Sequence, residues 1–222
     1  EPIIKQIREI DHVQIIRIGT KVPAFNPFRI LNDPSLLEMF KTYSTDEKKI
    51  YIMAHFNHPR ELTPEAIEGL NLLMKSEVSL VNQTPLLKGV NDDPEVLAEL
   101  FSKLSYIGVP PYYVFLCRPT LGNETYSVPV ERGYEIFEKS RTLCSGLAKR
   151  ARLVMSHESG KIEVLGMSED QIFFKFLRAA DKINDARFMA FFRNPEACWF
   201  DDYQEASDEF SLFSQTVRAG CS

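Results

Sequence analysis

Features of membrane, secreted and metal-binding proteins are scarce in this sequence. No run of eighteen apolar residues occurs, and the first five residues lack the basic-then-apolar layout of a signal peptide. The cysteines lie far apart without a Cys-x-x-Cys pair, so their spacing indicates neither a zinc site nor an iron-sulfur site. We therefore expect a cytoplasmic protein with reduced thiols, no metal ligands and no contact with a membrane. The cysteines are Cys117, Cys144, Cys198 and Cys221.

An excess of positive charge is also lacking. The net charge is -5 at pH 7, whereas proteins that bind nucleic acid concentrate positive charge to displace counterions from phosphate. With 222 residues, of which 44% are hydrophobic, the chain can bury one sizeable core. Small molecules are therefore the expected ligands, and nucleic acid is not.

Apolar segments and helical patterns alternate along most of the chain. Strand starts recur about every 30 to 40 residues with a helix between most of them, which is typical of βαβ units in a parallel sheet. The strands are apolar almost throughout, so both faces should be covered. We predict an α/β fold, a partial TIM-type barrel of parallel strands, with an open doubly wound sheet as the alternative; no Gly-x-Gly-x-x-Gly supports a dinucleotide fold. The predicted strands are 12–19, 49–55, 78–82, 111–117 and 153–156, and the predicted helices are 33–43, 63–76, 92–106 and 129–142.

The alternation of predicted strands and helices ends after residue 161. Two aromatic-rich segments, 172–177 and 187–192, are separated by a polar stretch and predict an antiparallel hairpin. We therefore expect a barrel portion at 1–166 and a β-rich C-terminal appendage at 167–222. The appendage either caps the barrel or forms an interface in a homo-oligomer, because exposed aromatic hairpins often find partners.

Polar side chains follow the predicted strands, most densely in the stretch 54–61 between a strand and a helix. His55, Asn57 and His58 crowd into this short turn. Because the carboxyl ends of parallel strands meet at the ligand-binding face of α/β folds, we expect these polar groups to line one site. Its other members are Lys21, Asn82, Gln83, Arg118, Ser156, His157 and Lys161.

Each of these residues also has a purely structural interpretation. His55 and His58 could bond to loop carbonyls, and a zinc site is weaker still, because the two lie three apart on a turn without an obvious third ligand. The two amides after the third strand could cap a turn. Arg118 and Lys161 could be ordinary surface cations.

Three long motifs resemble one known family. They are His-Phe-Asn-His-Pro at 55–59, Asn-Gln-Thr-Pro-Leu-Leu-Lys-Gly-Val-Asn-Asp at 82–92 and Pro-Tyr-Tyr-Val-Phe-Leu-Cys at 111–117. They closely resemble the lysine 2,3-aminomutase family of radical S-adenosylmethionine enzymes. Shorter matches lie at 17–20, 125–130 and 145–147, so the resemblance spans about residues 1–166.

The resemblance implies a partial α/β barrel that holds pyridoxal phosphate, S-adenosylmethionine and a [4Fe-4S] cluster. In that family the reduced cluster cleaves S-adenosylmethionine, and the resulting radical abstracts hydrogen from an amino acid bound to the pyridoxal. The amino group then migrates to the adjacent carbon, an isomerisation for which the barrel excludes water.

The same resemblance assigns roles to residues. Lys161 stands where the family places the lysine that forms a Schiff base with pyridoxal phosphate, so we expect it to be the catalytic lysine. Gln83 matches a position near S-adenosylmethionine, and His157 could meet the pyridoxal or merely belong to its loop. The cofactor-binding residues that the resemblance implies are His55, Asn57, His58, Asn82, Gln83 and His157.

One departure from the family concerns the cluster. The Cys-x3-Cys-x2-Cys motif that ligates it is absent, and so is a nearby arginine for the substrate carboxylate. Without three thiolates there is no cluster and no radical. We expect the chain to be the C-terminal portion of a longer protein, or a split or decayed copy, that is inactive alone and lacks its N-terminal half-barrel.

A second departure concerns the substrate. Lysine-specific members carry aspartates where this chain has Arg118 and Ser156. A guanidinium reverses the local charge and attracts an anionic side chain, such as that of glutamate. Two functions stay open: an amino-acid 2,3-aminomutase completed by its other half, and a silent module that binds pyridoxal phosphate or a nucleoside. A self-sufficient Schiff-base enzyme built on Lys161 and His157 is a third.

Overall fold

The computed structural model describes residues 1–206; the later residues, among them Cys221, lie outside the described part. Within it the chain is a mixed α/β structure, and none of its helices is long and apolar enough to cross a membrane. The described chain divides into two compact units, and the domain boundary expected at residue 166 stays a prediction. The first unit comprises Glu1–Pro85, Asp93–Val114 and Lys139–Ala151, and the second comprises Leu86–Asp92, Phe115–Glu138 and the chain from Arg152 onward.

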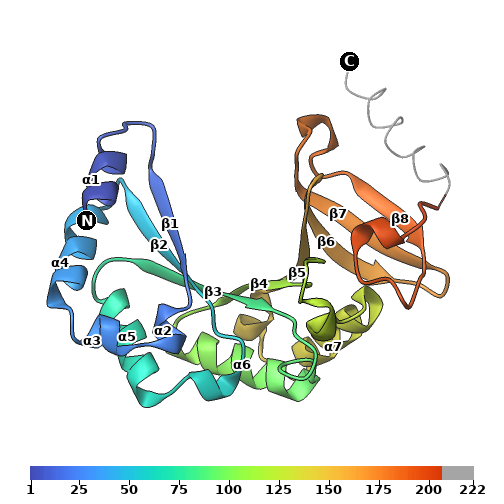
Figure 1. The fold of residues 1–222 in the computed structure, drawn as a ribbon, viewed down its shortest axis with the longest axis horizontal. Helices are drawn as coiled ribbons and strands as arrows, with labels where there is room; N and C mark the ends of the chain where they lie inside the picture. The colour runs from blue at the N-terminus through green and yellow to red at the C-terminus, as the bar shows by residue number, and fades with distance from the viewer. Residues whose placement is uncertain (207–222) are drawn as a thin grey trace. The chain divides into compact units, whose positions relative to one another are not determined.

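Parallel strands form the sheet of the first unit (Figure 1). Ile15 of β1 lies opposite Lys49 of β2, and Tyr51 of β2 lies opposite Ser79 of β3. The strands follow one another in sequence order, so the predicted parallel rhythm is confirmed for this part of the chain. The elements are β1 (Ile15–Thr20), β2 (Lys49–Ala54), β3 (Ser79–Pro85), β4 (Pro111–Phe115), α1 (Pro2–Arg8), α2 (Val22–Phe25), α3 (Phe28–Leu31), α4 (Pro34–Tyr43), α5 (Pro64–Met74), α6 (Pro94–Ile107) and the short 3-10 helices Pro59–Glu61 and Gly146–Arg150.

Three helices of this unit begin where the sequence predicts them. Asp33, Thr63 and Asp93 stand at the N-caps of α4, α5 and α6, and each side chain accepts a hydrogen bond from a backbone N–H of the first turn. A proline follows each cap, at a position where its missing N–H has no helical partner to lose. Local sequence therefore fixes these starts.

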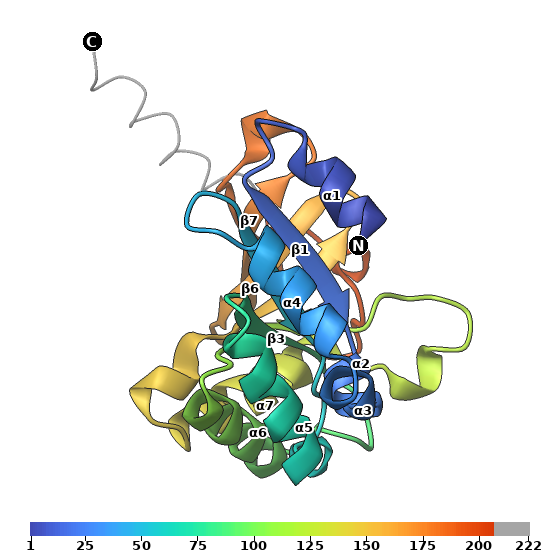
Figure 2. The same ribbon diagram turned by 90° about the vertical axis from the view of Figure 1, so that its left-hand side faces the viewer.

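The apolar core of the first unit lies between the strands and these helices. Figure 1 shows α5 and α6 alongside the strands, and Figure 2 shows α4 and α5 on the near side of them. Ile50 and Ile52 of β2 share one buried cluster with Leu70 and Leu73 of α5 and Leu100 of α6. This packing fixes β2 and β3, and the polar turn described below begins where β2 ends.

Antiparallel pairings join the four described strands of the second unit, a pairing that the sequence analysis predicted only for the aromatic hairpin. β5 pairs with β6, β6 with β7 and β7 with β8, all antiparallel. The sequence analysis missed β6, because the chain reverses through a turn of only two residues, 158 and 159. The predicted aromatic hairpin is confirmed as β7 and β8. The elements are α7 (Val130–Thr142, in this unit up to Glu138), β5 (Arg152–His157), β6 (Gly160–Met167), β7 (Gln171–Ala179), β8 (Phe188–Phe192) and the 3-10 helices Glu124–Tyr126, Lys182–Asn184 and Phe200–Asp202.

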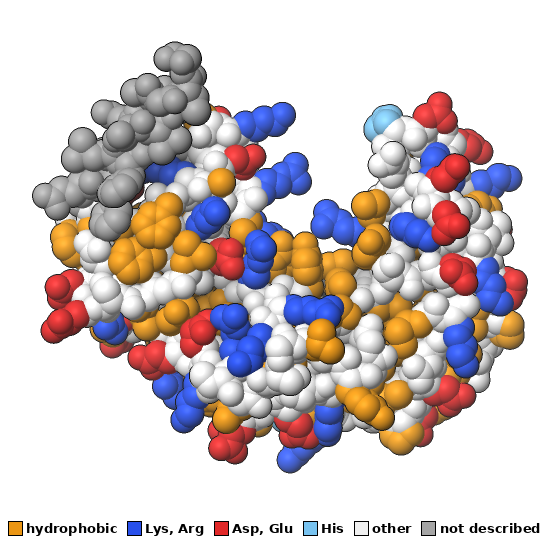
Figure 3. Space-filling view, turned by 180° about the vertical axis from the view of Figure 1, so that it is seen from behind, with side chains coloured by type: hydrophobic (Ala, Val, Ile, Leu, Met, Phe, Trp, Pro, Cys, Tyr) orange, Lys and Arg blue, Asp and Glu red, His pale blue; other side chains and the backbone are white. Residues whose placement is uncertain are grey.

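Aromatic rings build the core of the second unit. Phe174 stands edge-on to Phe191 and Phe200, with ring centroids 5.6 and 5.4 Å apart, and Tyr203 lies 5.3 Å from Phe174. Residues that follow β8 therefore cover one face of its sheet. Other hydrophobic side chains stay on the surface in this part of the molecule (Figure 3). Phe188 of β8 is 46% exposed.

Candidate functional site

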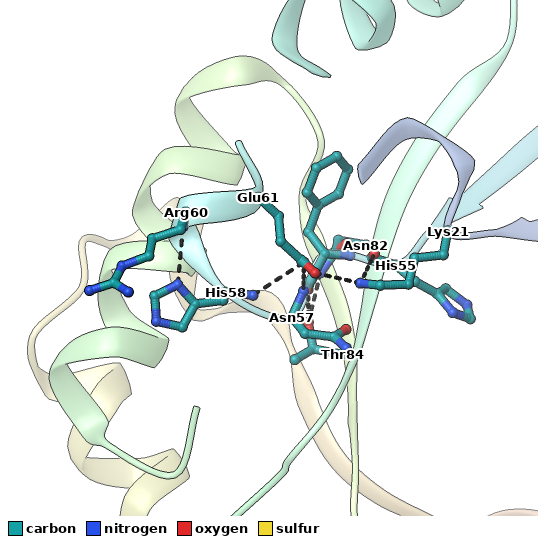
Figure 4. Close-up of polar contacts among 9 residues, drawn as sticks. Lys21, His55, Asn57, His58, Arg60, Glu61, Asn82 and Thr84 are labelled. Atoms are coloured by element: carbon teal, nitrogen blue, oxygen red, sulfur yellow. Dashed lines mark hydrogen bonds and ion pairs between the residues drawn. The ribbon is translucent and has the colours of Figure 1, made fainter. Parts of the chain in front are cut away.

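The turn after β2 is fixed by buried hydrogen bonds to its own backbone (Figure 4). Asn82 of β3 is 1% exposed; its Oδ1 accepts from Phe56 N at 2.8 Å, and its Nδ2 donates to Phe56 O at 3.1 Å. The Thr84 hydroxyl donates to the same carbonyl at 2.7 Å. Both ends of the Asn82 amide are thus used to hold Phe56, whose side chain is fully buried.

Glu61 closes the same turn. One carboxylate oxygen accepts hydrogen bonds from the backbone N–H groups of Asn57 at 2.5 Å and His58 at 3.4 Å, and the other pairs with Lys21 Nζ at 2.6 Å. Lys21 also donates to His55 O at 3.3 Å. Sequence reasoning missed Glu61, although a carboxylate three residues after an N-cap is the signature of a capping box.

The two imidazoles of the turn have different surroundings. His58 Nδ1 accepts a hydrogen bond from Arg60 N at 3.1 Å, so the neutral ring carries its proton on Nε2. His55 is half-buried, and its Nε2 lies 4.0 Å from where a Cβ would stand on Gly19 of β1. Burial, and after it the positive charge of Lys21, lowers the pKa of His55, which favours the neutral imidazole.

The side chains of Gln83 and Asn82 point to opposite faces of β3. Side chains alternate along a strand, and the buried positions of β3 are Leu80, Asn82 and Thr84. Gln83 therefore points to the opposite face of β3, where it is half-buried. The two amides do not act as one pair, and the cofactor contacts expected of each stay predictions.

Lys161 lies on β6, next to the turn of its hairpin with β5. Lys161 stands opposite Ser156 of β5 and Arg178 of β7, so these three side chains share one face of the sheet. Lys161 Nζ lies 5.0 Å from the centroid of the ring of Phe115, the last residue of β4, which belongs to the second unit as Lys161 does. Sequence reasoning placed Lys161 in a loop after the fifth strand; its position within a strand gives the amine a defined direction.

Gly160 fixes the backbone immediately before this lysine. Its φ is 140°, which L side chains rarely adopt, and a Cβ there would lie 2.3 Å from Arg178 O. The neighbouring Ser159 carbonyl accepts a hydrogen bond from Ala180 N at 2.7 Å. Gly160 is therefore needed for the close approach of β7 to the hairpin that carries Lys161.

His157 lies on the other face of this hairpin. It follows Ser156 in β5, so its side chain points away from the face of Lys161, and that side chain is 7% exposed. Its Nε2 lies 3.0 Å from Asp201 Oδ2, and its Nδ1 lies 2.6 Å from Ser159 Oγ. The structure does not bring His157 and Lys161 together on one face; a contact of His157 with pyridoxal stays a prediction.

Arg118 lines a pocket of about 460 Å³ in the second unit. The neighbouring Cys117 thiol donates to Leu86 O at 3.3 Å, and burial raises the pKa of that thiol. Pockets of this size hold small molecules, and a guanidinium on an apolar wall is suited to an anionic group. The lining residues are Cys117, Arg118, Pro119, Thr120, Leu121, Asn123, Glu124, Ser127 and Cys198.

The chain is similar in sequence to aminomutases, although no model of a known protein family matches it. An Aquifex aeolicus (strain VF5) protein named "Putative L-lysine 2,3-aminomutase" is 56% identical over 211 residues, 95% of this chain and 56% of that protein. The L-lysine 2,3-aminomutase of Clostridium subterminale is 44% identical over 146 residues, 66% of this chain and 34% of the enzyme. The glutamate 2,3-aminomutase of Clostridioides difficile (strain 630) is 36% identical over 160 residues, 72% of this chain and 36% of the enzyme. The chain thus spans between about a third and somewhat more than half of the length of these relatives.

Proposed function

This chain belongs to the lysine 2,3-aminomutase family by sequence, and from this premise we propose that it is part of a cytoplasmic isomerase that moves an amino group between adjacent carbons of an amino acid. The relatives are longer than the matched region, so further parts of the active site are expected in an N-terminal half-barrel. In this proposal β1–β4 are strands of a partial TIM-type barrel, and the complete protein forms a homo-oligomer.

The placement of Lys161 carries the proposal. A primary amine beside an aromatic ring, on one face with a hydroxyl and a guanidinium, fits an aldehyde cofactor that bears a phosphate. Lys161 would bind the aldehyde carbon of pyridoxal phosphate, and Arg178 and Ser156 would face its phosphate. When bound, pyridoxal phosphate supplies a conjugated system through which nitrogen can pass from one carbon to the next.

The described residues of this chain do not fit an iron-sulfur cluster. Within 1–206, no three side chains of His, Cys, Asp or Glu lie together as a metal site requires. Cys117, Cys144 and Cys198 are free thiols. We therefore assign the [4Fe-4S] cluster to the N-terminal half-barrel, and Gln83 of this chain to the side of the site that would hold S-adenosylmethionine.

We propose that the substrate has an anionic or polar side chain. Arg118 is exposed at the pocket, whose wall includes the apolar side chains of Pro119 and Leu121. A guanidinium can bind a carboxylate through two hydrogen bonds while apolar walls receive the methylenes between the two ends. Glutamate fits this arrangement, whereas the terminal ammonium of lysine would be repelled.

Reductive trapping on the full chain tests the pyridoxal part of the proposal. Incubation with pyridoxal phosphate followed by borohydride should leave a pyridoxyl group on Lys161, located by mass spectrometry. Lys161→Arg should lose the label, and the control Lys175→Arg, on the neighbouring strand β7, should keep it. Label distributed over several lysines, or unchanged in Lys161→Arg, would contradict the proposal.

Turnover is tested on the complete protein, without oxygen and with S-adenosylmethionine and a reductant. Glutamate should be converted to its 3-amino isomer faster than lysine, and Arg118→Asp should reverse this preference. Faster turnover of lysine that Arg118→Asp diminishes would show the substrate proposal to be wrong. Trapping at Lys161 without any turnover would favour a catalytically silent pyridoxal-binding module instead.

A further inference from the structure

The C-terminal strap, residues 193–203, packs on the face of the second unit's sheet that Lys161 does not use. Phe200 of the strap lies 5.4 Å from the Phe174 ring and 5.1 Å from the Phe191 ring. Glu131 of α7, 3% exposed, holds the start of the strap: its carboxylate accepts from Arg193 Nε at 2.9 Å and from Asn194 N at 2.7 Å. The strap is therefore a fixed part of this unit.

A tight turn inside the strap brings Asp201 to the lysine hairpin. Asp202 Oδ2 accepts hydrogen bonds from Cys198 N at 3.0 Å and Trp199 N at 2.9 Å, which closes the turn. The neighbouring Asp201 carboxylate then reaches His157 Nε2 at 3.0 Å. The imidazole lies between the strap's aromatic rings, 5.4 Å from Phe200 and 6.1 Å from Trp199.

The hydrogen bonds of His157 define its tautomer. Ser159 N donates to Nδ1 at 3.1 Å, so Nδ1 is an acceptor and Nε2 carries the hydrogen. Nε2 therefore donates to Asp201 Oδ2. Through this ring the strap holds the turn at 158–159, which comes directly before Gly160 and Lys161.

We propose that Asp201 is a positioning residue for Lys161. On one side the turn is fixed by the contact of Gly160 with the β7 backbone, where a Cβ would lie 2.3 Å from Arg178 O. On the other side it is fixed by the hydrogen bond that His157 Nε2 donates to Asp201. The strap thus sets the direction from which the amine of Lys161 meets an aldehyde ligand, an inference that rests on the function proposed for this lysine.

Two substitutions of Asp201 distinguish the effect of its hydrogen bond to His157 from the effect of its negative charge. Asp201→Ala removes the acceptor and should slow reductive trapping of pyridoxal phosphate at Lys161 about tenfold, the equivalent of one lost hydrogen bond. Asp201→Asn keeps an oxygen that Nε2–H can reach and should trap within about twofold of the unaltered chain. The control Glu205→Ala removes an exposed ion pair of the same unit, to Arg187 at 2.8 Å, and should leave the trapping rate unchanged.

Amide hydrogen exchange supplies a readout that needs no cofactor. Asp201→Ala should speed exchange at 159–161, and Asp201→Asn and Glu205→Ala should not. Equal trapping in Asp201→Ala and the unaltered chain, or equal slowing in Asp201→Ala and Asp201→Asn, would overturn the inference. If the unaltered chain forms no adduct at Lys161, the proposed function fails, and unchanged exchange in Asp201→Ala would then also exclude the positioning role.

Discussion

A histidine lies in the turn after β2, and another, His157, lies directly before the turn that precedes Lys161, yet the two turns are fixed in opposite ways. In the first unit, Asn82 reaches across 26 residues of sequence to the turn's own backbone at Phe56. In the second unit, the side chain of His157, the last residue of β5, reaches Asp201, 44 residues later. The first turn is held by its neighbouring strand, and the second depends on a distant part of the chain.

This difference bears on where ligand chemistry is expected. The amide of Asn82 and the carboxylate of Glu61 are already used to hold the turn after β2. The hairpin of the second unit is fastened through His157 on one face, while Lys161 stands on the other. Polar residues that cluster in the sequence can therefore stabilise the fold. Lys161, on a hairpin that other contacts fix in place, is better placed to react with a ligand.

The largest expected effect is that of Gly160→Ala. The new Cβ would meet the β7 backbone and must also adopt φ 140°, so we expect a loss of about 4 kcal/mol in the free energy of unfolding. Gly89→Ala is the matched control, because its φ is 75° but nothing lies within 4 Å of a Cβ there, and it should lose only about 1 kcal/mol. Urea denaturation measures both, and equal losses would refute the contact with β7 as the cause.

Asn82→Ala tests the first turn and should have the next largest effect. It leaves the buried N–H of Phe56 without its acceptor, which we expect to reduce the free energy of unfolding by about 2–3 kcal/mol. Gln83→Ala, on the other face of β3, should change it by less than about 0.5 kcal/mol. Similar losses in the two variants would mean that the amide of Asn82 does not hold the turn.

The ion pair of Lys21 and Glu61 should contribute less to the free energy of unfolding than the amide of Asn82. Its side chains are 40% and 26% exposed, so a double-mutant cycle with Lys21→Met and Glu61→Gln should give a coupling energy of about 0.5–1 kcal/mol that falls as salt is added. The Arg187–Glu205 pair of the second unit, 50% and 55% exposed, should give about 0.2 kcal/mol. A larger coupling in the more exposed pair would contradict the assignment of Lys21 and Glu61 to the turn.

Local signals in the sequence predicted the three longest helices of the first unit but not the shorter α1, α2 and α3, and long-range contacts contribute to the misses in the second unit. Asp33, Thr63 and Asp93 mark helix starts within one turn of the chain, so these starts were predicted correctly. β6 was missed because the chain reverses after β5 through a turn of only two residues, and no local pattern encodes the close approach of β7 to Gly160 beside that turn. The role proposed for Lys161 came from a family resemblance, and no sequence pattern links Asp201 to His157.

The smallest expected effect is a change in the pH dependence of stability at His55. Burial, and then the charge of Lys21, lowers the pKa of His55, so the unfolded chain binds the proton more readily than the folded one. The contribution of the neutral His55 to the free energy of unfolding is therefore fully present above the pKa of the residue in the unfolded chain, about 6.5. It is lost as the pH falls through the lower pKa of the residue in the folded chain. His55→Gln should make the decline in stability between about pH 7.5 and about pH 5.5 shallower.

Urea denaturation across this range, with two further variants, identifies the cause. Lys21→Met removes the positive charge that lowers the pKa of His55 but leaves the imidazole buried. It should therefore flatten the decline in stability less than His55→Gln does. His12→Gln removes an exposed imidazole from the same unit and serves as the control. If His55→Gln leaves the decline as steep as in the unaltered chain, the imidazole beside Gly19 is not buried as the structure describes. A decline that Lys21→Met flattens more than His55→Gln would instead make the charge of Lys21 the dominant influence on this turn.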